Sequence, residues 1–389
     1  MPDFMNLLIL MVVVWTAGKI FRSLRLPVVL GQLLGGILVG PALFGLVDPG
    51  SETIKVLAEL GIFFLMLHAG LETDHRELLK ASKRSFLIAL GGTILPFAGG
   101  YCIARLFGQP QIASLFIGMG LSVSAIAMSA RVFKDCKIMN TRAANVTLGA
   151  AIFENILALI FFSIIINIAE QGEVQFIPLL ILLAKVIAFF AVVIFAGIRF
   201  SKFMNKILYF GNKGFTLTLI IALLMGLIAE AIGLHMIIGA FLAGLFIHEE
   251  VLEERVYRKI EDRIYGLSYG FFGPIFFVSL AFNLDLATFT EAPYFLLSII
   301  AIAILGKVIG SGIVAKFEKL KNLESIIIGL AMNNRGAAEL VIATIGLQMG
   351  IIDQKVFSIL VAMAFITTIF SILATSPLAK KLKETQDLS

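Results

Sequence analysis

The stretch Ala150-Ala151-Ile152-Phe153-Glu154-Asn155-Ile156-Leu157 places an acid and an amide near the middle of an apolar run that covers residues 144–169. A run of that length is long enough to cross a bilayer as a helix. A carboxylate at bilayer depth costs about 2.5–3.5 kcal/mol on insertion scales, so it persists where it faces a bundle interior, a water-filled cavity or an ion. The stretch therefore indicates a membrane protein, and Glu154 is the strongest pointer to what the protein moves.

The composition supports this class. The chain has 389 residues, of which 59% are hydrophobic and only 15% are charged, whereas soluble domains are about 45–50% apolar. The basic residues that give the net charge of +5 are spread through short loops, so nucleic acid is not an expected partner. No Walker motif or GxGxxG loop is present, so ATP-driven transport by this chain alone is not expected. The sequence contains no evident pairing of a nucleophile with a general base, so covalent catalysis is not expected.

Apolar runs broken by charge, Gly or Pro predict an all-α polytopic membrane protein with about thirteen transmembrane helices. We expect one transporter domain over residues 1–379, followed by a short cytoplasmic tail at 380–389. The predicted helices are 5–21, 26–47, 53–71, 85–107, 111–133, 144–169, 176–198, 214–232, 235–249, 266–284, 294–315, 324–348 and 355–378. A mixed-charge stretch before the tenth helix, up to Arg263, is expected to form an interfacial linker helix.

The loop charges give these helices a direction. Of the 31 Lys and Arg residues, 25 fall in the tail and in loops on one side of the thirteen-helix arrangement. Positive charge collects on the cytoplasmic side of membrane proteins. The pattern therefore predicts an N-terminus outside the cell and a cytoplasmic C-terminus.

The charged residues near the midpoints of predicted helices include Glu154, Lys307, Arg335 and Glu339. Carboxylate oxygens can replace the hydration water of an ion, and a nearby ammonium can release or take up a proton, so opposite charges at one depth are typical of an ion pathway. The alternative is a set of buried ion pairs that pin helices together. Arg335 and Glu339 are four residues apart on one helix face, so a mutual ion pair would explain both without a transport role.

Two predicted helices contain sequences that favour an interruption. One reads Gly118-Met119-Gly120-Leu121-Ser122-Val123-Ser124-Ala125-Ile126 and the other Met332-Asn333-Asn334-Arg335-Gly336-Ala337-Ala338. Transporters use freed carbonyls and half-helix ends at such breaks to hold ions, although small residues also form packing faces. Because the two helices run in opposite directions in the predicted topology, they fit an inverted-topology repeat. We therefore predict two crossed, broken helices.

At this point the chain resembles the monovalent cation:proton antiporters, in the bacterial branch that includes the Na⁺/H⁺ exchangers and the Kef-type potassium efflux systems. The resemblance runs nearly end to end. It is carried, in order, by LPVVLGQLLGG at 26–36 with Gly40-Pro41, AELG at 58–61, AGLE at 69–72, GAFLAG at 239–244, FFGPIFF at 271–277 and MNNRGAAEL at 332–340.

The resemblance implies a homodimer in the lipid bilayer of a bacterial or archaeal cell. Each protomer would contain a dimerisation domain and a mobile core, with core helices at about 85–169 and 294–378, and would work by alternating access without a cofactor. Na⁺ or K⁺ and H⁺ would be the transported ions. Glu154 and Asn155 fall on the ion-binding pair and would hold the alkali cation, with Ser122 and Ser124 at the first break. Lys307 would compensate charge at this pair, as would Arg335 and Glu339.

One departure from the family pattern affects the predicted chemistry. The second position of the ion-binding pair is normally an acid, whereas here the order is Glu154 and then Asn155. Glu154 either takes over ion and proton binding, serves only as the salt-bridge partner of Lys307, or belongs to a site for something other than a lone alkali cation. The first reading is favoured, and it predicts one titratable acid per site and 1:1 exchange.

Other function classes stay open at this stage. They are an uncoupled channel, a sodium-coupled symporter for an organic solute, and a transport-deficient sensor or partner of the same fold. Selectivity between Na⁺ and K⁺ and the electrical balance of exchange are not readable from the sequence. Nucleotide control of the Kef kind would need a separate regulatory subunit.

Overall fold

The computed structural model describes residues 2–23, 28–72, 83–171, 212–247 and 254–387, together with 181, 184–185, 188–189, 191–193 and 195. All regular elements in these ranges are helices, which confirms the all-α prediction. Eight of the described helices are long and apolar enough to cross a membrane, and five shorter apolar helices accompany them. The predicted count of thirteen stays a prediction, and most of the predicted helix 176–198 lies outside the described residues.

The chain divides into two compact units, each made of two separate stretches of sequence. The first unit comprises Met1–Asp74 and Gln175–Leu284, and the second comprises His75–Val174 and Asp285–Ser389. Each unit is described by itself below. The roles of dimerisation domain and mobile core stay predictions.

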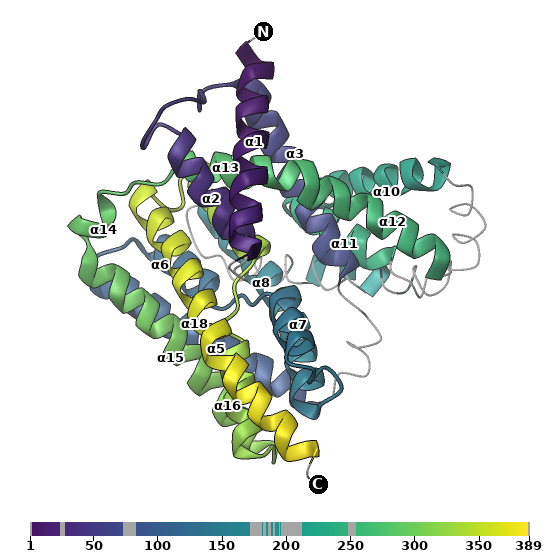
Figure 1. Ribbon diagram of the computed structural model, residues 1–389, viewed down its shortest axis with the longest axis vertical. Coiled ribbons are helices and arrows are strands. Elements are labelled where there is room, and N and C mark those ends of the chain that lie inside the picture. The colour runs from purple at the N-terminus through teal and green to yellow at the C-terminus, as the bar shows by residue number, and fades with distance from the viewer. Residues whose placement is uncertain are drawn as a thin grey trace. The chain divides into compact units, whose positions relative to one another are not determined.

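The first unit contains both long and short helices, which are labelled in Figure 1. Close glycine contacts join α3 to α11, where a Cβ at Gly70 would clash with the backbone of Phe241. The described helices of this unit are α1 (Pro2–Ser23), α2 (Val28–Val39), α3 (Glu52–Leu71), α10 (Asn212–Ala231), α11 (Met236–Phe246), α12 (Glu254–Leu267), the π-helical turn η1 (Ser268–Phe272) and α13 (Gly273–Phe282).

Two predicted boundaries in this unit were wrong. The run 26–47 is not one helix, because α2 ends at Val39 and the chain turns through Gly45, which has a φ of +57°. The run 266–284 is part of a longer helical stretch that begins at Glu254 and continues through η1 to Phe282. The charged segment is helical because it is amphipathic: Tyr257, Ile260 and Ile264 are buried at helical spacing, while its charged side chains are largely exposed.

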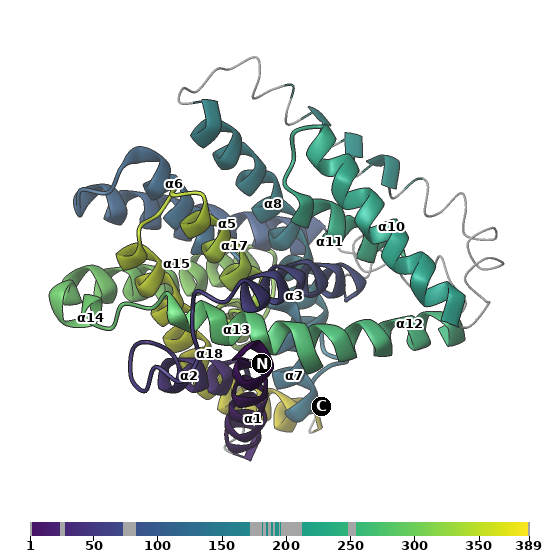
Figure 2. The same ribbon diagram turned by 90° about the horizontal axis from the view of Figure 1, so that it is seen from above.

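The second unit contains the charged residues predicted to form the site. Glycines let α15 approach α5 closely, since a Cβ at Gly91 would clash with the carbonyl of Gly310; Figures 1 and 2 show these two helices side by side. Its helices are α5 (Lys83–Leu106), α6 (Gln111–Gly120), α7 (Ile126–Asp135), α8 (Arg142–Gln171), α14 (Thr288–Glu291), α15 (Pro293–Phe317), α16 (Asn322–Ala331), α17 (Ala337–Gln348) and α18 (Gln354–Asp387). The last helix therefore continues through most of the predicted tail.

Both predicted helix interruptions are present in this unit. One helical run stops after Gly120 and resumes at Ile126, and the other stops after Ala331 and resumes at Ala337. We call the intervening residues 121–125 the first break and residues 332–336 the second break. The crossing of these helices as an inverted repeat stays a prediction.

Candidate functional site

Glu154 on α8 and Lys307 on α15 form a fully buried ion pair. The Lys307 Nζ lies 2.6 Å from Glu154 Oε2, and both side chains have 0% exposure. The same ammonium donates a hydrogen bond to the carbonyl of Ser122 in the first break. A buried pair of this kind is tolerated because the two charges offset one another and the remaining protons find acceptors. The predicted association of Lys307 with Glu154 is therefore present as a direct contact.

The two breaks are joined to each other by hydrogen bonds. Ser124 Oγ donates to the carbonyl of Met332 at 2.6 Å, and the backbone N–H of Ala125 donates to the carbonyl of Asn334 at 2.8 Å. Ser124 is also close to the Glu154 carboxylate. Unwound backbone needs such partners, because an unpaired buried N–H or carbonyl is costly. Polar groups of each break are thus hydrogen-bonded to backbone carbonyls of the other, next to the buried carboxylate of Glu154.

Ser122 is bound to the backbone on two sides. Its hydroxyl lies within hydrogen-bonding distance of the carbonyl of Gly118 at 2.9 Å and of Thr93 at 3.1 Å. Since Lys307 takes the carbonyl of the same residue, it is the Ser122 carbonyl rather than its hydroxyl that faces the ion pair. The residue was selected from the sequence for its side chain, and the structure assigns the contact to its backbone.

Arg335, in the second break, makes most of its hydrogen bonds with backbone carbonyls at the end of α6 and in the first break. Its guanidinium donates to the carbonyls of Gly120 at 3.2 Å and Leu121 at 2.9 Å, and to that of Val123. These carbonyls sit at the C-terminal end of α6, where unpaired acceptors and the helix dipole favour a cation. Arg335 therefore caps the broken end of α6.

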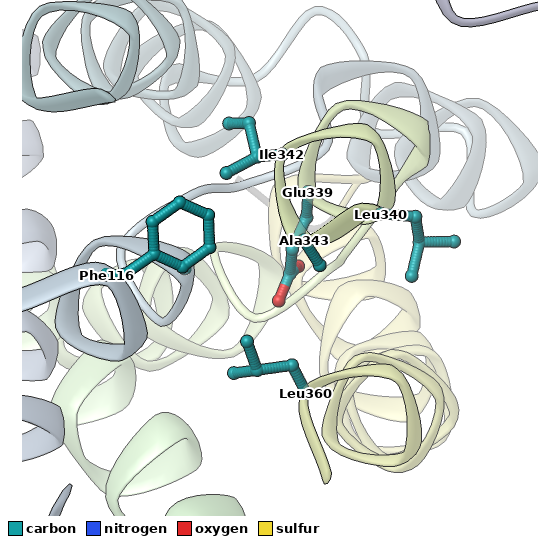
Figure 3. Close-up of a pocket in the computed structure, with 7 residues that line it drawn as sticks. Phe116, Glu339, Leu340, Ile342, Ala343 and Leu360 are labelled. Carbon is teal, nitrogen blue, oxygen red and sulfur yellow. The ribbon is translucent and has the colours of Figure 1, made fainter. Parts of the chain in front are cut away.

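Glu339 is a looser partner of Arg335. Its Oε2 lies 3.7 Å from Arg335 Nε, and neither carboxylate oxygen has a hydrogen-bond partner among the described residues. Figure 3 shows the carboxylate in a narrow cleft, whose lining residues are Phe116, Gly120, Leu340, Ile342, Ala343 and Leu360. The predicted pairing of Arg335 with Glu339 is present, but at a longer distance than the pairing of Lys307 with Glu154.

Unpaired oxygens mark where the site could accept a cation. Glu154 Oε1 and Asn155 Oδ1 are both buried, and neither has a hydrogen-bond partner within the part of the chain that the structure describes. Asn155 follows Glu154 directly, so its side chain leaves α8 about 100° around the helix axis. Glu154 is thus the acid at the centre of the described contacts, whereas no described contact joins the Asn155 amide to it.

Sequence reasoning missed three hydroxyl and amide groups that support the breaks. The amide of Asn334 donates to Ser129 Oγ at 3.0 Å, and that hydroxyl donates to the carbonyl of Ala331 at 2.9 Å. The backbone N–H of Arg335 donates to Thr368 Oγ1 at 2.9 Å. Their only signal in the sequence is a polar residue inside an apolar helix, which fits many local roles.

The chain is similar to known membrane proteins along most of its length. A family model described as "Sodium/hydrogen exchanger, transmembrane" matches residues 7–381. The chain is 33% identical to the probable Na⁺/H⁺ antiporter GerT of Bacillus cereus over 361 residues, which covers 92% of this chain and 94% of GerT. It is also 33% identical to the Na⁺/H⁺-K⁺ antiporter GerN of Bacillus cereus over 359 residues, with 91% and 90% covered.

The fold is similar to that of a solved antiporter. The structure of the sodium proton antiporter MjNhaP1 from Methanocaldococcus jannaschii matches with a TM-score of 0.80. The match covers 98% of this chain and 99% of that one, at 18% sequence identity. At this identity the likeness establishes the fold alone.

Proposed function

Because the chain belongs to the sodium/hydrogen exchanger family, we propose that it exchanges a monovalent cation, Na⁺ or K⁺, for protons across the bilayer. The family consists of membrane transporters rather than enzymes. The relatives GerT and GerN are named as Na⁺/H⁺ and Na⁺/H⁺-K⁺ antiporters. Their names support both alkali cations as substrates and do not choose between them.

The residue that carries the exchange is Glu154. The observation behind this assignment is that its carboxylate is fully buried and divides its two oxygens between different surroundings: Oε2 contacts Lys307, and Oε1 has no donor among the described residues. If Glu154 served only as the salt-bridge partner of Lys307, its unpaired buried oxygen would destabilise the fold and nothing would offset the loss. A cation or a proton on the carboxylate removes that cost.

The mechanism is competition for one carboxylate. A cation bound at Glu154 leaves no place for a proton, and a protonated Glu154 has no charge with which to hold a cation. Exchange follows when the loaded core, but not the empty one, alternates between the two membrane faces. A single acid per site gives 1:1 exchange, with Lys307 offsetting the carboxylate charge when the site is empty. The homodimer and the cytoplasmic C-terminus belong to the same proposal.

The test uses purified protein in liposomes that hold a pH-sensitive dye and an imposed proton gradient. Na⁺, K⁺, Li⁺ and choline are added in turn to vesicles with the wild-type chain or Glu154→Gln. We expect one or more alkali cations, but not choline, to move protons in the wild type. In Glu154→Gln the rate should fall to that of protein-free vesicles, because the amide neither binds the proton nor carries charge.

Glu324→Gln is the matched control. Glu324 is another buried acid of the second unit, and it accepts a hydrogen bond from the backbone N–H of Lys321 at 2.9 Å at the start of α16. An amide oxygen can still accept that bond, so exchange should survive. Substantial exchange by Glu154→Gln would refute the assigned role. Proton flux without any added cation would favour a channel, and a folded wild type that moves no protons would favour a sensor or partner protein.

A further inference from the structure

A second oxygen lies beside the free oxygen of Glu154. Ser311 on α15 is fully buried, and its Oγ has no hydrogen-bond partner among the described residues. A Cβ placed on Gly92 of α5 would clash with both Glu154 Oε1 and Ser311 Oγ. The two oxygens therefore border the same space, above the Cα of Gly92.

Ser311 and Lys307 lie on the same face of α15, because they are four positions apart, but they are close to different oxygens of Glu154. Lys307 takes Oε2 of Glu154, while Ser311 lies on the side of Oε1. Helix α15 thus offers an ammonium to one oxygen of the carboxylate and a neutral hydroxyl oxygen to the surroundings of the other.

The chemistry of this pair of oxygens suits a small cation. Unsatisfied buried polar groups cost about 1–3 kcal/mol each, and native proteins keep few of them without a reason. Alkali cations are held by oxygen atoms that replace their hydration water. One carboxylate oxygen and one hydroxyl oxygen, facing the same space, supply a charge and a dipole for that purpose.

We propose that Ser311 is a ligand of the transported cation, acting with Glu154 Oε1, and that Gly92 is required because a side chain there would occupy their common space. The proposal rests on the function proposed above, and it names further residues of the same site. The cation binds on the Oε1 side, so Lys307 can keep its contact with Oε2 while the site is loaded.

The residues on both sides of Gly92 are held by contacts with other segments. The carbonyl of Thr93 accepts a hydrogen bond from Ser122 Oγ of the first break at 3.1 Å, and Gly91 packs directly against the backbone of Gly310 on α15. The backbone of α5 is therefore fixed against both the first break and α15 at the level of Glu154. A side chain added at position 92 would therefore have to displace the ends of the Glu154 and Ser311 side chains.

The first experiment compares wild type with Ser311→Ala by two readouts. One is the apparent KM for Na⁺ and K⁺ in the liposome assay, and the other is the cation-dependent rise in melting temperature of the detergent-purified protein, with choline chloride as the reference salt. We expect Ser311→Ala to raise the apparent KM by about tenfold, equivalent to about 1.4 kcal/mol. Its maximal rate should change little, and most of the thermal stabilisation by cations should be lost.

Ser163→Ala is the matched control. Ser163 is also a buried serine, but its hydroxyl donates to the carbonyl of Leu159 within α8 at 2.8 Å. It lies nine residues from Glu154 on the same helix, about 13 Å along the axis. Its loss should leave both the apparent KM and the cation-dependent stabilisation unchanged.

Gly92→Ala tests the space itself. We expect a folded protein, judged by gel filtration, that neither exchanges nor is stabilised by any alkali cation. Wild-type behaviour of Ser311→Ala in both readouts, with Glu154→Gln inactive, would overturn the inference and leave the proposed function standing. If the wild type showed no exchange but was stabilised by cations in a way that depends on Ser311, the cation site would stand and the proposed function would be overturned. Absence of both effects in the wild type would refute both.

Discussion

Lys307 and Arg335 are both buried cations with a carboxylate neighbour, and their hydrogen bonds go to different kinds of partner. Lys307 directly contacts the side chain of Glu154 at 2.6 Å. Arg335 donates from its terminal nitrogens to three backbone carbonyls at the end of α6 and in the first break, and leaves only Nε near Glu339, at 3.7 Å. The first cation pairs with a group that can change its charge, and the second pairs with groups that cannot.

This difference distinguishes a cation proposed to take part in ion exchange from a cation that holds the fold together. An arginine stays protonated in proteins and has donors fixed in a plane, which suits several carbonyls at once. A lysine is a compact charge on a flexible chain, so its contact with a carboxylate can loosen when the carboxylate takes up a proton. We therefore assign Arg335 to holding the first break together and Lys307 to offsetting the charge of Glu154. Three substitutions test this division.

Arg335→Met should have the largest effect. It leaves three carbonyls at the end of α6 without their donor and Glu339 without its cation. Removing one partner of a buried charged network costs about 3–5 kcal/mol. We expect low yields of folded protein, and a melting temperature lower by several degrees in the part that folds, measured in detergent without added cation. Normal folding and stability of Arg335→Met would contradict the capping role.

Lys307→Ala should have an intermediate effect. Glu154 loses its ammonium, but it can remain neutral by keeping a proton, so the chain should fold and melt above Arg335→Met. Under 1:1 exchange at Glu154, the transport rate in the liposome assay should fall by less than in Glu154→Gln. A loss as complete as that of Glu154→Gln would show that Lys307 itself takes part in the exchange of protons.

Glu72 extends the comparison to an acid whose partner among the described residues is a histidine, and its substitution should have the smallest effect. It follows α3 in the first unit, where His68 Nδ1 lies 3.7 Å from its Oε1. Burial, reinforced by the negative charge of Glu261, raises the pKa of Glu72 from 4.5 to about 7. The folded state therefore binds this proton more tightly than the unfolded state, and stability is lost as the pH rises from about 4.5 through about 7.

Glu72→Gln removes this ionisation. We expect its melting temperature to exceed that of the wild type by a few degrees at pH 8 and by less at pH 5. The measurement is a melting curve in detergent across that pH range. A difference between the two proteins that does not vary with pH would show that Glu72 has another role.

The sequence predicted features that depend on local composition. Gly, Ser and Asn at mid-membrane depth marked both breaks, and isolated charges in apolar runs marked Glu154 and Lys307. The helical spacing of the charged stretch up to Arg263 predicted a helix there, but the continuation of that helix through η1 to Phe282 was not predicted. The acceptors of Arg335 could not be predicted, since Gly120 is 215 positions away in sequence and a backbone carbonyl leaves no mark in it. The shared space of Gly92, Glu154 and Ser311 likewise exists only once three helices have packed.

The hydrogen bonds between the two breaks limit what can move during a transport cycle. Ala125 donates to Asn334, Ser124 donates to Met332, and Arg335 holds the end of α6. Pulling the breaks apart would leave all of these buried groups without partners, so in the proposed transport cycle the two breaks would move together as one rigid body. A cation would then meet the same oxygens whichever side of the membrane it entered from. Ion preference would accordingly be a fixed property of this rigid body, identical for uptake and release, and the direction of net transport would be set by the gradients alone.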